Sequence, residues 1–110
     1  MSETTELILV LVTAPDISTA RRIAEELVSR KIAACVNVSP GWNSIYRWEG
    51  QVQEESEVLL LIKTRSCLFE PQLIPAVQEL HPYDLPEIIA LPIQDGEKNY
   101  LAWMMDEVKG

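Results

Sequence analysis

The sequence predicts an α+β fold: a ferredoxin-like β-α-β-β-α-β sandwich with a long protruding β-hairpin and a C-terminal helix. Three observations predict it. The apolar runs Leu7–Val12 and Val58–Ile62 are typical of strands that are buried on both faces. Residues 17–30 and 66–80 carry apolar side chains at helical spacing. Between them, Lys31–Thr64 has the pattern of two extended arms joined by a tight turn.

The first helix is predicted to begin just after the first strand. Ala14, Pro15 and Asp16 end that strand, and the Asp16 carboxylate can accept a hydrogen bond from a backbone N–H in the first helical turn. The apolar residues that follow lie on one helical stripe: Ile17, Ala20, Ile23, Ala24, Leu27 and Val28. This stripe indicates a helix that packs on the sheet and turns its charged side chains to water.

The predicted hairpin is longer than the body of its own domain. Each arm could reach on the order of 50 Å, whereas a domain of this length has a radius of gyration of about 13 Å. We therefore expect the arms to bend or to leave the body. Pro40-Gly41 is the expected bend, since both residues interrupt a regular ladder, and Glu49-Gly50 is the expected turn.

The outer part of the hairpin carries three large aromatic residues. Trp42, Tyr46 and Trp48 share one face, because side chains alternate along a strand. A two-stranded hairpin with that much apolar surface is not stable alone in water. The two central strands are apolar on both faces, and two helices cover only one face of a sheet, so the other face also needs to be covered. Both features predict a homo-oligomer.

The second helical stretch, residues 66–80, contains two prolines. Either the helix begins at Pro71 and bends at Pro75, or it is kinked at both positions. His81 is expected to end the helix, because a residue that precedes proline disfavours helical backbone angles.

The last part of the chain is predicted to add one strand and one helix. Glu87–Ile93 has the composition of a strand, and Pro92 places it at a sheet edge or marks the strand's end. Asp95-Gly96 is a predicted turn, and Asn99–Val108 is a predicted closing helix.

Composition argues against two classes of partner. The 110 residues carry 17 acidic and 9 basic side chains, a net charge of −8. Nucleic acid and anionic membranes are bound by basic surfaces, so we expect neither as a partner. The length suits one domain, residues 1–110, and no signal peptide or membrane-spanning run is visible. Cys35 and Cys67 lack metal-type spacing and indicate reduced thiols in a cytoplasmic protein.

Several short stretches resemble the CutA divalent-cation tolerance family. They follow the expected order over nearly the whole chain: Thr13-Ala14-Pro15-Asp16, Ala33-Ala34-Cys35-Val36-Asn37, Pro40-Gly41, Ser44-Ile45-Tyr46-Arg47-Trp48-Glu49-Gly50, Leu61-Ile62-Lys63-Thr64, His81-Pro82-Tyr83, Pro86-Glu87-Ile88-Ile89 and Tyr100-Leu101-Ala102-Trp103. The resemblance implies a tight homotrimer, similar in plan to PII-type signalling proteins, whose hairpins pair between subunits. It also implies a link to copper and other divalent cations.

Two residues are candidates for a metal site. His81 is the only histidine, and with Cys35 it supplies the nitrogen and sulfur donors that copper-type cations prefer. The alternative is structural: His81 shapes the turn before Pro82, and Cys35 is a small buried hydrophobe. Two ligands from one chain make a poor closed site. We therefore expect no obligatory cofactor, and only weak binding of copper or another divalent cation.

A second candidate site takes its residues from the stretches that resemble the family: Trp48, Lys63, Tyr83, Glu87, Tyr100 and Trp103. Lys63 ends a buried strand, where a charge needs a partner, and Glu87 at the start of the edge strand is the expected one. The group is interpreted either as a structural ion pair ringed by aromatic residues or as a cleft between subunits. Such a cleft would bind a small anionic or zwitterionic ligand.

Three glutamates on the second arm of the hairpin resemble a carboxylate cluster. Glu55 and Glu57 share one strand face, and Glu54 lies on the other, so their oxygens do not converge as a calcium-type site requires. We interpret them as a solvated edge that discourages aggregation.

The sequence shows no enzymatic motif. The four glycines build neither a P-loop nor a dinucleotide fingerprint, and nothing orients a Cys–His pair. Together with the resemblance to the CutA family, which implies the trimer and the link to divalent-cation tolerance, this leads us to expect a cytoplasmic homotrimeric binding protein with metal or a small ligand bound between subunits. The alternatives are a rigid trimeric scaffold with no direct metal role, and an enzyme that uses Lys63, Glu87 and Tyr83.

Overall fold

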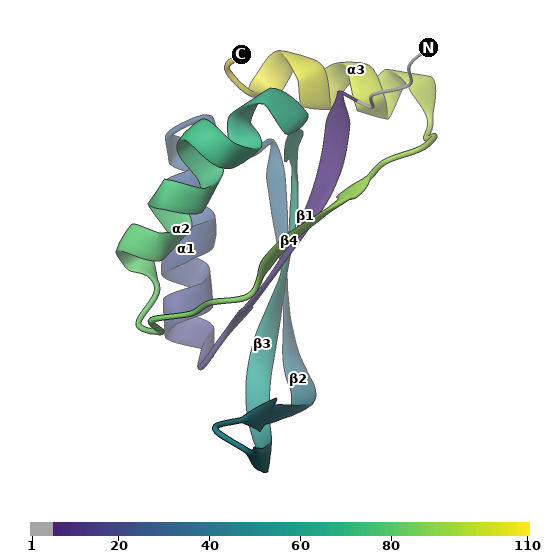
Figure 1. The fold of residues 1–110 in the computed structure, drawn as a ribbon. Coiled ribbons are helices and arrows are strands. Elements are labelled where there is room, and N and C mark those ends of the chain that lie inside the picture. The colour runs from purple at the N-terminus through teal and green to yellow at the C-terminus, as the bar shows by residue number, and fades with distance from the viewer. Residues whose placement is uncertain (1–5) are drawn as a thin grey trace.

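The computed structural model describes residues 6–110, and its elements follow the predicted order. They are β1 (Leu7–Ala14), α1 (Ile17–Ser29), β2 (Cys35–Trp48), β3 (Gln51–Arg65), α2 (Ile74–Leu80), β4 (Ile88–Pro92) and α3 (Lys98–Glu107). The strands form one four-stranded antiparallel sheet in the order β2-β3-β1-β4 (Figure 1). The predicted α+β class is confirmed, and β4 lies at an edge as Pro92 predicts. Residues 1–5, which bear on the expected lack of a signal peptide, lie outside the described residues.

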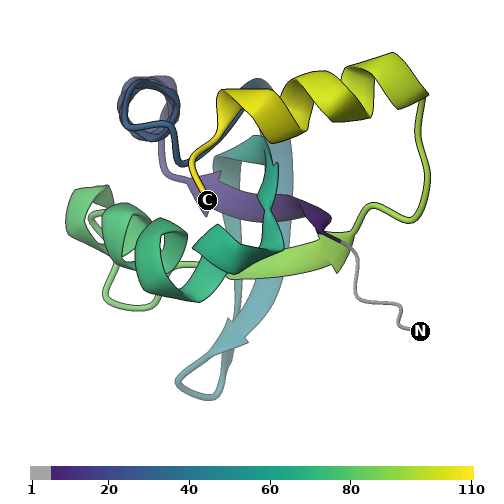
Figure 2. The same cartoon turned by 90° about the horizontal axis from the view of Figure 1, so that it is seen from above.

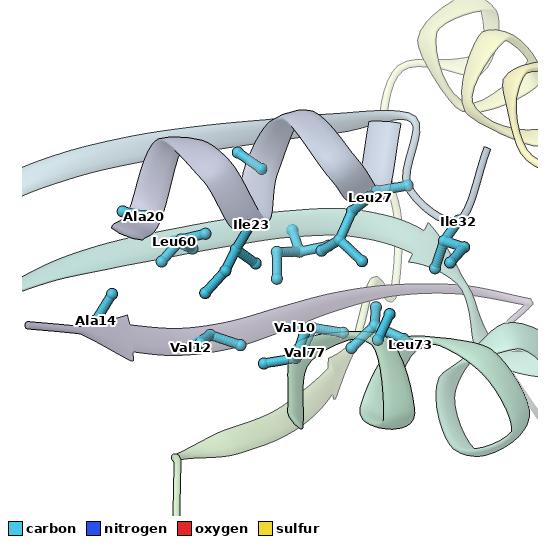
Figure 3. Close-up of a cluster of buried hydrophobic side chains, with 14 of the residues drawn as sticks. Val10, Val12, Ala14, Ala20, Ile23, Leu27, Ile32, Leu60, Leu73 and Val77 are labelled. Atoms are coloured by element: carbon cyan, nitrogen blue, oxygen red, sulfur yellow. The ribbon is translucent and has the colours of Figure 1, made fainter. Parts of the chain in front are cut away.

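The core lies between the sheet and two helices. α1 and α2 pack on the same side of the sheet (Figures 1 and 2). Asp16 caps α1 as predicted, because its carboxylate accepts a hydrogen bond from the Thr19 N–H at 2.7 Å. Alternate residues of the central strands meet the helical stripes in a layer of fully buried side chains: Val10, Val12, Ile23, Leu27, Leu60, Leu73 and Val77 (Figure 3). Ile62 on β3 is also fully buried and belongs to the same core cluster.

The opposite face of the sheet is also apolar, but it is less well covered. Leu61 and Ile89 lie level with Leu11 across the sheet, so these side chains form one row. Ile89 and Leu91 on β4 are each about half exposed. α3 covers only the end of the sheet, where Met104 and Val108 pack with Leu7, Ala34 and Leu68 (Figure 2). The expectation that this face needs further cover is therefore consistent with its exposure.

The hairpin has the predicted turn and the predicted bend. Glu49 and Gly50 both have positive φ, 50° and 76°, as a type I′ turn requires. The pairing register shifts between Ser39 and Trp42, and Gly41 adopts a left-handed φ of 85°, which favours glycine. Beyond this bulge the two strands pair only with each other and leave the body of the domain (Figure 1).

The second helical stretch differs from both predicted alternatives. A 3-10 turn over Ser66–Leu68 leads into a wider π-type segment, Phe69–Leu73, and α2 begins only at Ile74. Pro75 lies in the first turn of α2, where its missing N–H leaves no bond unmade. Residues 93–97 have no regular turn, contrary to the prediction for Asp95-Gly96. None of the helices within residues 6–110 has the length and apolar character needed to cross a membrane.

Candidate functional site

Three of the predicted ligand-binding residues meet at the end of the sheet, where β3 approaches α3. The Lys63 ammonium nitrogen lies 3.4 Å from the Tyr100 hydroxyl oxygen and 5.5 Å from the centroid of the Tyr100 ring. The Tyr100 and Trp103 rings lie 5.4 Å apart between centroids, at an angle of 37°. Both aromatic side chains remain 41% exposed. Lys63, Tyr100 and Trp103 thus form one open group, which we call the amine–aromatic site.

Glu97 positions the aromatic half of this site. Its carboxylate accepts hydrogen bonds from the backbone N–H groups of Asn99 and Tyr100, at 3.1 Å and 2.9 Å. These bonds satisfy two N–H groups that the start of a helix leaves free. Tyr100 is thereby held in the first turn of α3. Trp103 lies three residues later, on the neighbouring part of the same helix surface.

Glu87 is not the partner of Lys63 within one chain. Leu9 on β1 pairs with both Lys63 and Leu91, so Lys63 is level with Leu91. Glu87 precedes Leu91 by four residues, about 13 Å along the strand, and is about two strand spacings, some 10 Å, across the sheet. The predicted ion pair is therefore not formed within this chain, and Lys63 contacts the Tyr100 hydroxyl instead.

Tyr83 lies in a different place, at the root of the hairpin. Its hydroxyl donates a hydrogen bond to the Glu57 carboxylate at 3.1 Å, and Glu57 is only 7% exposed. Burial, together with the hydrogen bond and the negative charge of Glu57, raises the pKa of Tyr83 to about 12. The interpretation of Glu57 as part of a solvated edge is therefore wrong, because the segment after α2 places Tyr83 against it.

Both ring nitrogens of His81 are engaged within the chain. Nδ1 accepts a hydrogen bond from the Tyr83 N–H at 3.2 Å, so Nε2 carries the proton and donates to the Thr13 carbonyl at 2.7 Å. The ring is buried and lies 4.7 Å from the Tyr83 ring. A metal ion binds a nitrogen lone pair, and neither nitrogen offers one without losing a hydrogen bond. The geometry supports the structural reading, in which His81 shapes the turn.

Cys35 lies at the other end of the sheet from His81. It pairs with Lys63, which is level with Leu9, whereas His81 bonds to Thr13, four residues further along β1. The fold therefore does not bring the two predicted metal ligands together within one chain. Among residues 6–110, no group of three or more histidine, cysteine, aspartate or glutamate side chains is arranged to hold a metal ion.

Trp48 stands apart from all of these residues. It pairs with Gln51 at the tip of the hairpin, while Lys63 pairs with Cys35 at the opposite end of β2. Trp48 lies thirteen positions after Cys35, a length of about 40 Å for an extended strand. Two surface hollows, of about 320 and 420 Å³, lie elsewhere, and neither is lined by a predicted site residue. Within a single chain, the six candidate residues do not form one cleft.

A profile of the CutA1 divalent ion tolerance protein family matches residues 8–107. The chain belongs to this family. It is 51% identical over 98 residues to the divalent-cation tolerance protein CutA of Thermus thermophilus, which covers 89% of this chain and 94% of that protein. It is 47% identical over 108 residues to the chloroplastic CutA of Arabidopsis thaliana, covering 98% of this chain but only 59% of that protein.

Solved structures of CutA proteins have the same fold. The structure of the Thermus thermophilus divalent cation tolerance protein superposes with a TM-score of 0.91 at 48% identity, over 94% of this chain and 99% of that one. CutA1 from Oryza sativa gives a TM-score of 0.91 at 45% identity, over 98% of each chain. The names of the Thermus thermophilus protein and its structure describe a divalent-cation tolerance protein, and none of the three names is that of an enzyme.

Sequence reasoning missed three residues that position site groups in this CutA family member. Glu97 carries only a weak signal, since acidic residues are favoured near the start of a helix but the preferred N-cap residues are Ser, Thr, Asp and Asn. The Glu57–Tyr83 contact, across 26 residues, and the Thr13 carbonyl that receives the His81 proton carry none. Both contacts depend on the path of the segment between α2 and β4.

Proposed function

We propose that this CutA family protein takes part in divalent-cation tolerance as a homotrimer of single-domain chains. In this proposal it binds a small ligand, or weakly a cation, between subunits and has no enzymatic activity. The exposed outer hairpin carries the proposal: Ile45 and Val52 are each 68% exposed, and Trp48 is about half exposed. That much apolar surface on a two-stranded arm favours burial against another copy. The half-exposed Ile89 and Leu91 on the open sheet face support the same arrangement.

The oligomeric state is the first test. Sedimentation equilibrium of the full-length chain at micromolar concentration should give three times the monomer mass. A folded monomer would contradict the proposal, and a stable dimer would contradict its trimeric part.

The six candidate residues can share one cleft only if different copies contribute them. Trp48 lies at the far tip of the hairpin, and Glu87 lies too far from Lys63 to pair with it in the same chain. A double-mutant cycle with Lys63→Gln and Glu87→Gln tests whether the pair forms between subunits. Coupling well above about 0.5 kcal/mol would support contact across an interface, because sites this far apart in one chain are additive within that amount.

Copper binding requires a revised prediction. His81 offers no free lone pair, so Cys35, which is partly exposed on the open face, becomes the leading candidate donor. Copper heads the divalent affinity order for sulfur ligands. In titrations with copper, Cys35→Ala should weaken binding, and His81→Asn should leave the affinity unchanged. Equal affinity in the wild type and both variants would mean diffuse binding by the acidic surface.

A rigid trimeric scaffold with an indirect role in cation tolerance is the second candidate. The engaged nitrogens of His81 and the lack of a grouped metal site within residues 6–110 favour it. Calorimetry with copper, nickel, zinc and a panel of small metabolites separates the two candidates, since the scaffold should show no saturable heat with any of them.

A cytoplasmic location is also part of the proposal. Cys35 and Cys67 are both free, which suits a reducing compartment. The names of similar proteins include chloroplastic and periplasmic forms, so the compartment needs its own test. Fractionation of cells that express the full-length chain should recover it with cytoplasmic markers.

A further inference from the structure

One of the two surface hollows is built from three separate parts of the chain. It has a volume of about 320 Å³ and lies between the end of α1, α2 and the chain's C-terminus. The C-terminus returns beside the end of α1 (Figure 2), where the Lys109 N–H donates a hydrogen bond to the Lys31 carbonyl at 3.1 Å. The other hollow is lined only by residues between 17 and 25 of α1. The first hollow therefore owes its walls to tertiary contacts, and its volume suits a small ligand.

The walls of this hollow carry both signs of charge. Arg30, which ends α1, and Lys109 supply two cations, and Glu79 on α2 supplies a carboxylate. The Arg30 Nε and Nη2 atoms each lie 2.9 Å from the Glu26 carboxylate, while Nη1 lies 3.5 Å from the Glu79 carboxylate. The second contact is at the limit of a hydrogen bond, and a carboxylate has about four acceptor positions. Glu79 can therefore accept further hydrogen bonds from a ligand.

The rest of the lining is mainly apolar. Ile32 and Ala76 are only 3% and 4% exposed, and Pro75 lies beside them. The Gln72 side chain adds an amide, which can both donate and accept hydrogen bonds. A purely anionic ligand would be repelled by the carboxylate in the wall, and a purely cationic one by the two cations. The lining thus favours a ligand with both charges and an apolar group.

We propose that this hollow binds a small zwitterion of the aliphatic α-amino acid class. The ligand's carboxylate lies against the Lys109 ammonium, its own ammonium donates hydrogen bonds to the Glu79 carboxylate, and its side chain packs on Ile32 and Ala76. The inference goes beyond the proposed function, because every residue of the hollow comes from one chain. The hollow also lies beside α1 and α2, which cover the side of the sheet opposite the exposed face.

Four small probes separate the contributions of the two charges and the side chain. Leucine carries all three groups, isocaproate lacks the ammonium, leucinamide lacks the carboxylate, and glycine lacks the side chain. In NMR titrations of the full-length protein at pH 6.5, followed at the Gln72 side-chain amide and the Ala76 methyl group, leucine should bind at least fivefold more tightly than each of the others.

Two charge-removing variants should give opposite patterns. Lys109→Gln should weaken leucine and isocaproate at least fivefold and leave leucinamide unchanged. Glu79→Gln should weaken leucine and leucinamide at least fivefold and should not weaken isocaproate. Both side chains are exposed, so neither change should affect folding.

Matched controls use charged residues outside the hollow. Lys98→Gln, at the opposite end of α3, and Glu25→Gln should leave leucine binding unchanged. Glu25 is the closer match to Glu79, because it is also exposed and lies 3.6 Å from an arginine, Arg21. It lines the other hollow, so weakening by Glu25→Gln as large as that by Glu79→Gln would place the binding there and overturn the inference.

Two further results would overturn the inference: leucine binding no more tightly than isocaproate and leucinamide, or variants that weaken all the probes equally. The oligomeric state separates this inference from the proposed function. Selective leucine binding by a protein that sediments as a monomer would overturn the trimer and support the ligand class. A trimer that does not distinguish leucine from isocaproate would overturn the ligand class alone.

Discussion

The bulge divides the hairpin into an inner half, residues 35–39 and 58–65, and an outer half, residues 42–57. Both halves are built from β2 and β3, yet their surroundings differ completely. On β3, Leu60 is fully buried, whereas Val52 on the same strand is 68% exposed. The inner half pairs with β1 and is covered by α1, while the outer half pairs only with itself. Strand pairing alone therefore leaves apolar residues in water, and a third strand or a helix is what buries them. The exposed apolar residues of the outer half are the observation on which the proposed homotrimer rests.

Glu57 marks the boundary between the two halves. It pairs with Trp42, the first residue beyond the bulge, and it receives the Tyr83 hydroxyl from the segment after α2. Its neighbour Val58 is the first residue of β3 that pairs with β1. The boundary is thus held by a polar contact from a third part of the chain, not by the hairpin itself.

The outer half should depend on assembly more than any other part of the molecule. If a neighbouring copy buries the indole, Trp48→Ala should cost roughly 3–5 kcal/mol of the free energy of unfolding and lower the oligomeric state. Val28→Ala is a matched control, because Val28 on α1 is about as exposed as Trp48 in the single chain. Chemical denaturation and sedimentation measure both variants. If Trp48→Ala leaves the mass of the oligomer and the free energy of unfolding unchanged, the outer half does not depend on assembly more than the inner half does.

The inner half should show the ordinary cost of a cavity. Leu60→Ala removes a fully buried side chain and should lower the free energy of unfolding by about 3 kcal/mol, in urea titrations followed by circular dichroism. Glu54→Ala on the exposed outer half of β3 should change the free energy by less than about 0.5 kcal/mol. Equal effects at the two positions would mean that the outer half is as tightly packed as the core.

The boundary should be sensitive to alkali. Because folding raises the pKa of Tyr83 to about 12, its contribution to stability is complete below pH 10 and is lost as the pH rises from 10 to 12. Tyr83→Phe should lower the stability by about 1 kcal/mol at neutral pH and remove this part of the alkaline decline. Melting temperatures from pH 8 to 12 measure both effects. Tyr100→Phe should keep the decline, since its hydroxyl faces Lys63.

The smallest effect is expected in the helix that covers the inner half. Hydrogen bonds from Thr19 hold the pKa of Asp16 below its ordinary value. The charged carboxylate therefore stabilises α1 at pH values above the ordinary pKa of an aspartate, and this stabilisation is lost as the pH falls through the lowered pKa of Asp16. Asp16→Asn keeps an oxygen that can cap the helix but does not titrate. It should therefore show a shallower loss of melting temperature in acid than the wild type. Identical acid curves would mean that the cap does not contribute.

The sequence by itself determined the features that depend on a few consecutive residues. The order of the elements, the turn at Glu49-Gly50, the bend next to Gly41 and the cap at Asp16 follow from backbone preferences and from the spacing of apolar side chains. Such preferences act within a turn or a strand, so they can be recognised without knowing what lies nearby in space. The family resemblance named Lys63, Tyr100 and Trp103 as candidate site residues, which stays a prediction, and it did not give the contacts between them.

Only the tertiary structure decided which polar groups meet. Lys63 contacts Tyr100, 37 residues away, rather than Glu87, because strand register places Glu87 at a different level of the sheet. His81 makes hydrogen bonds with the Thr13 carbonyl and the Tyr83 N–H, and these contacts support a structural role for it. Such contacts depend on loop paths and on register, where a shift of one residue moves a side chain to the other face. No local pattern carries that information.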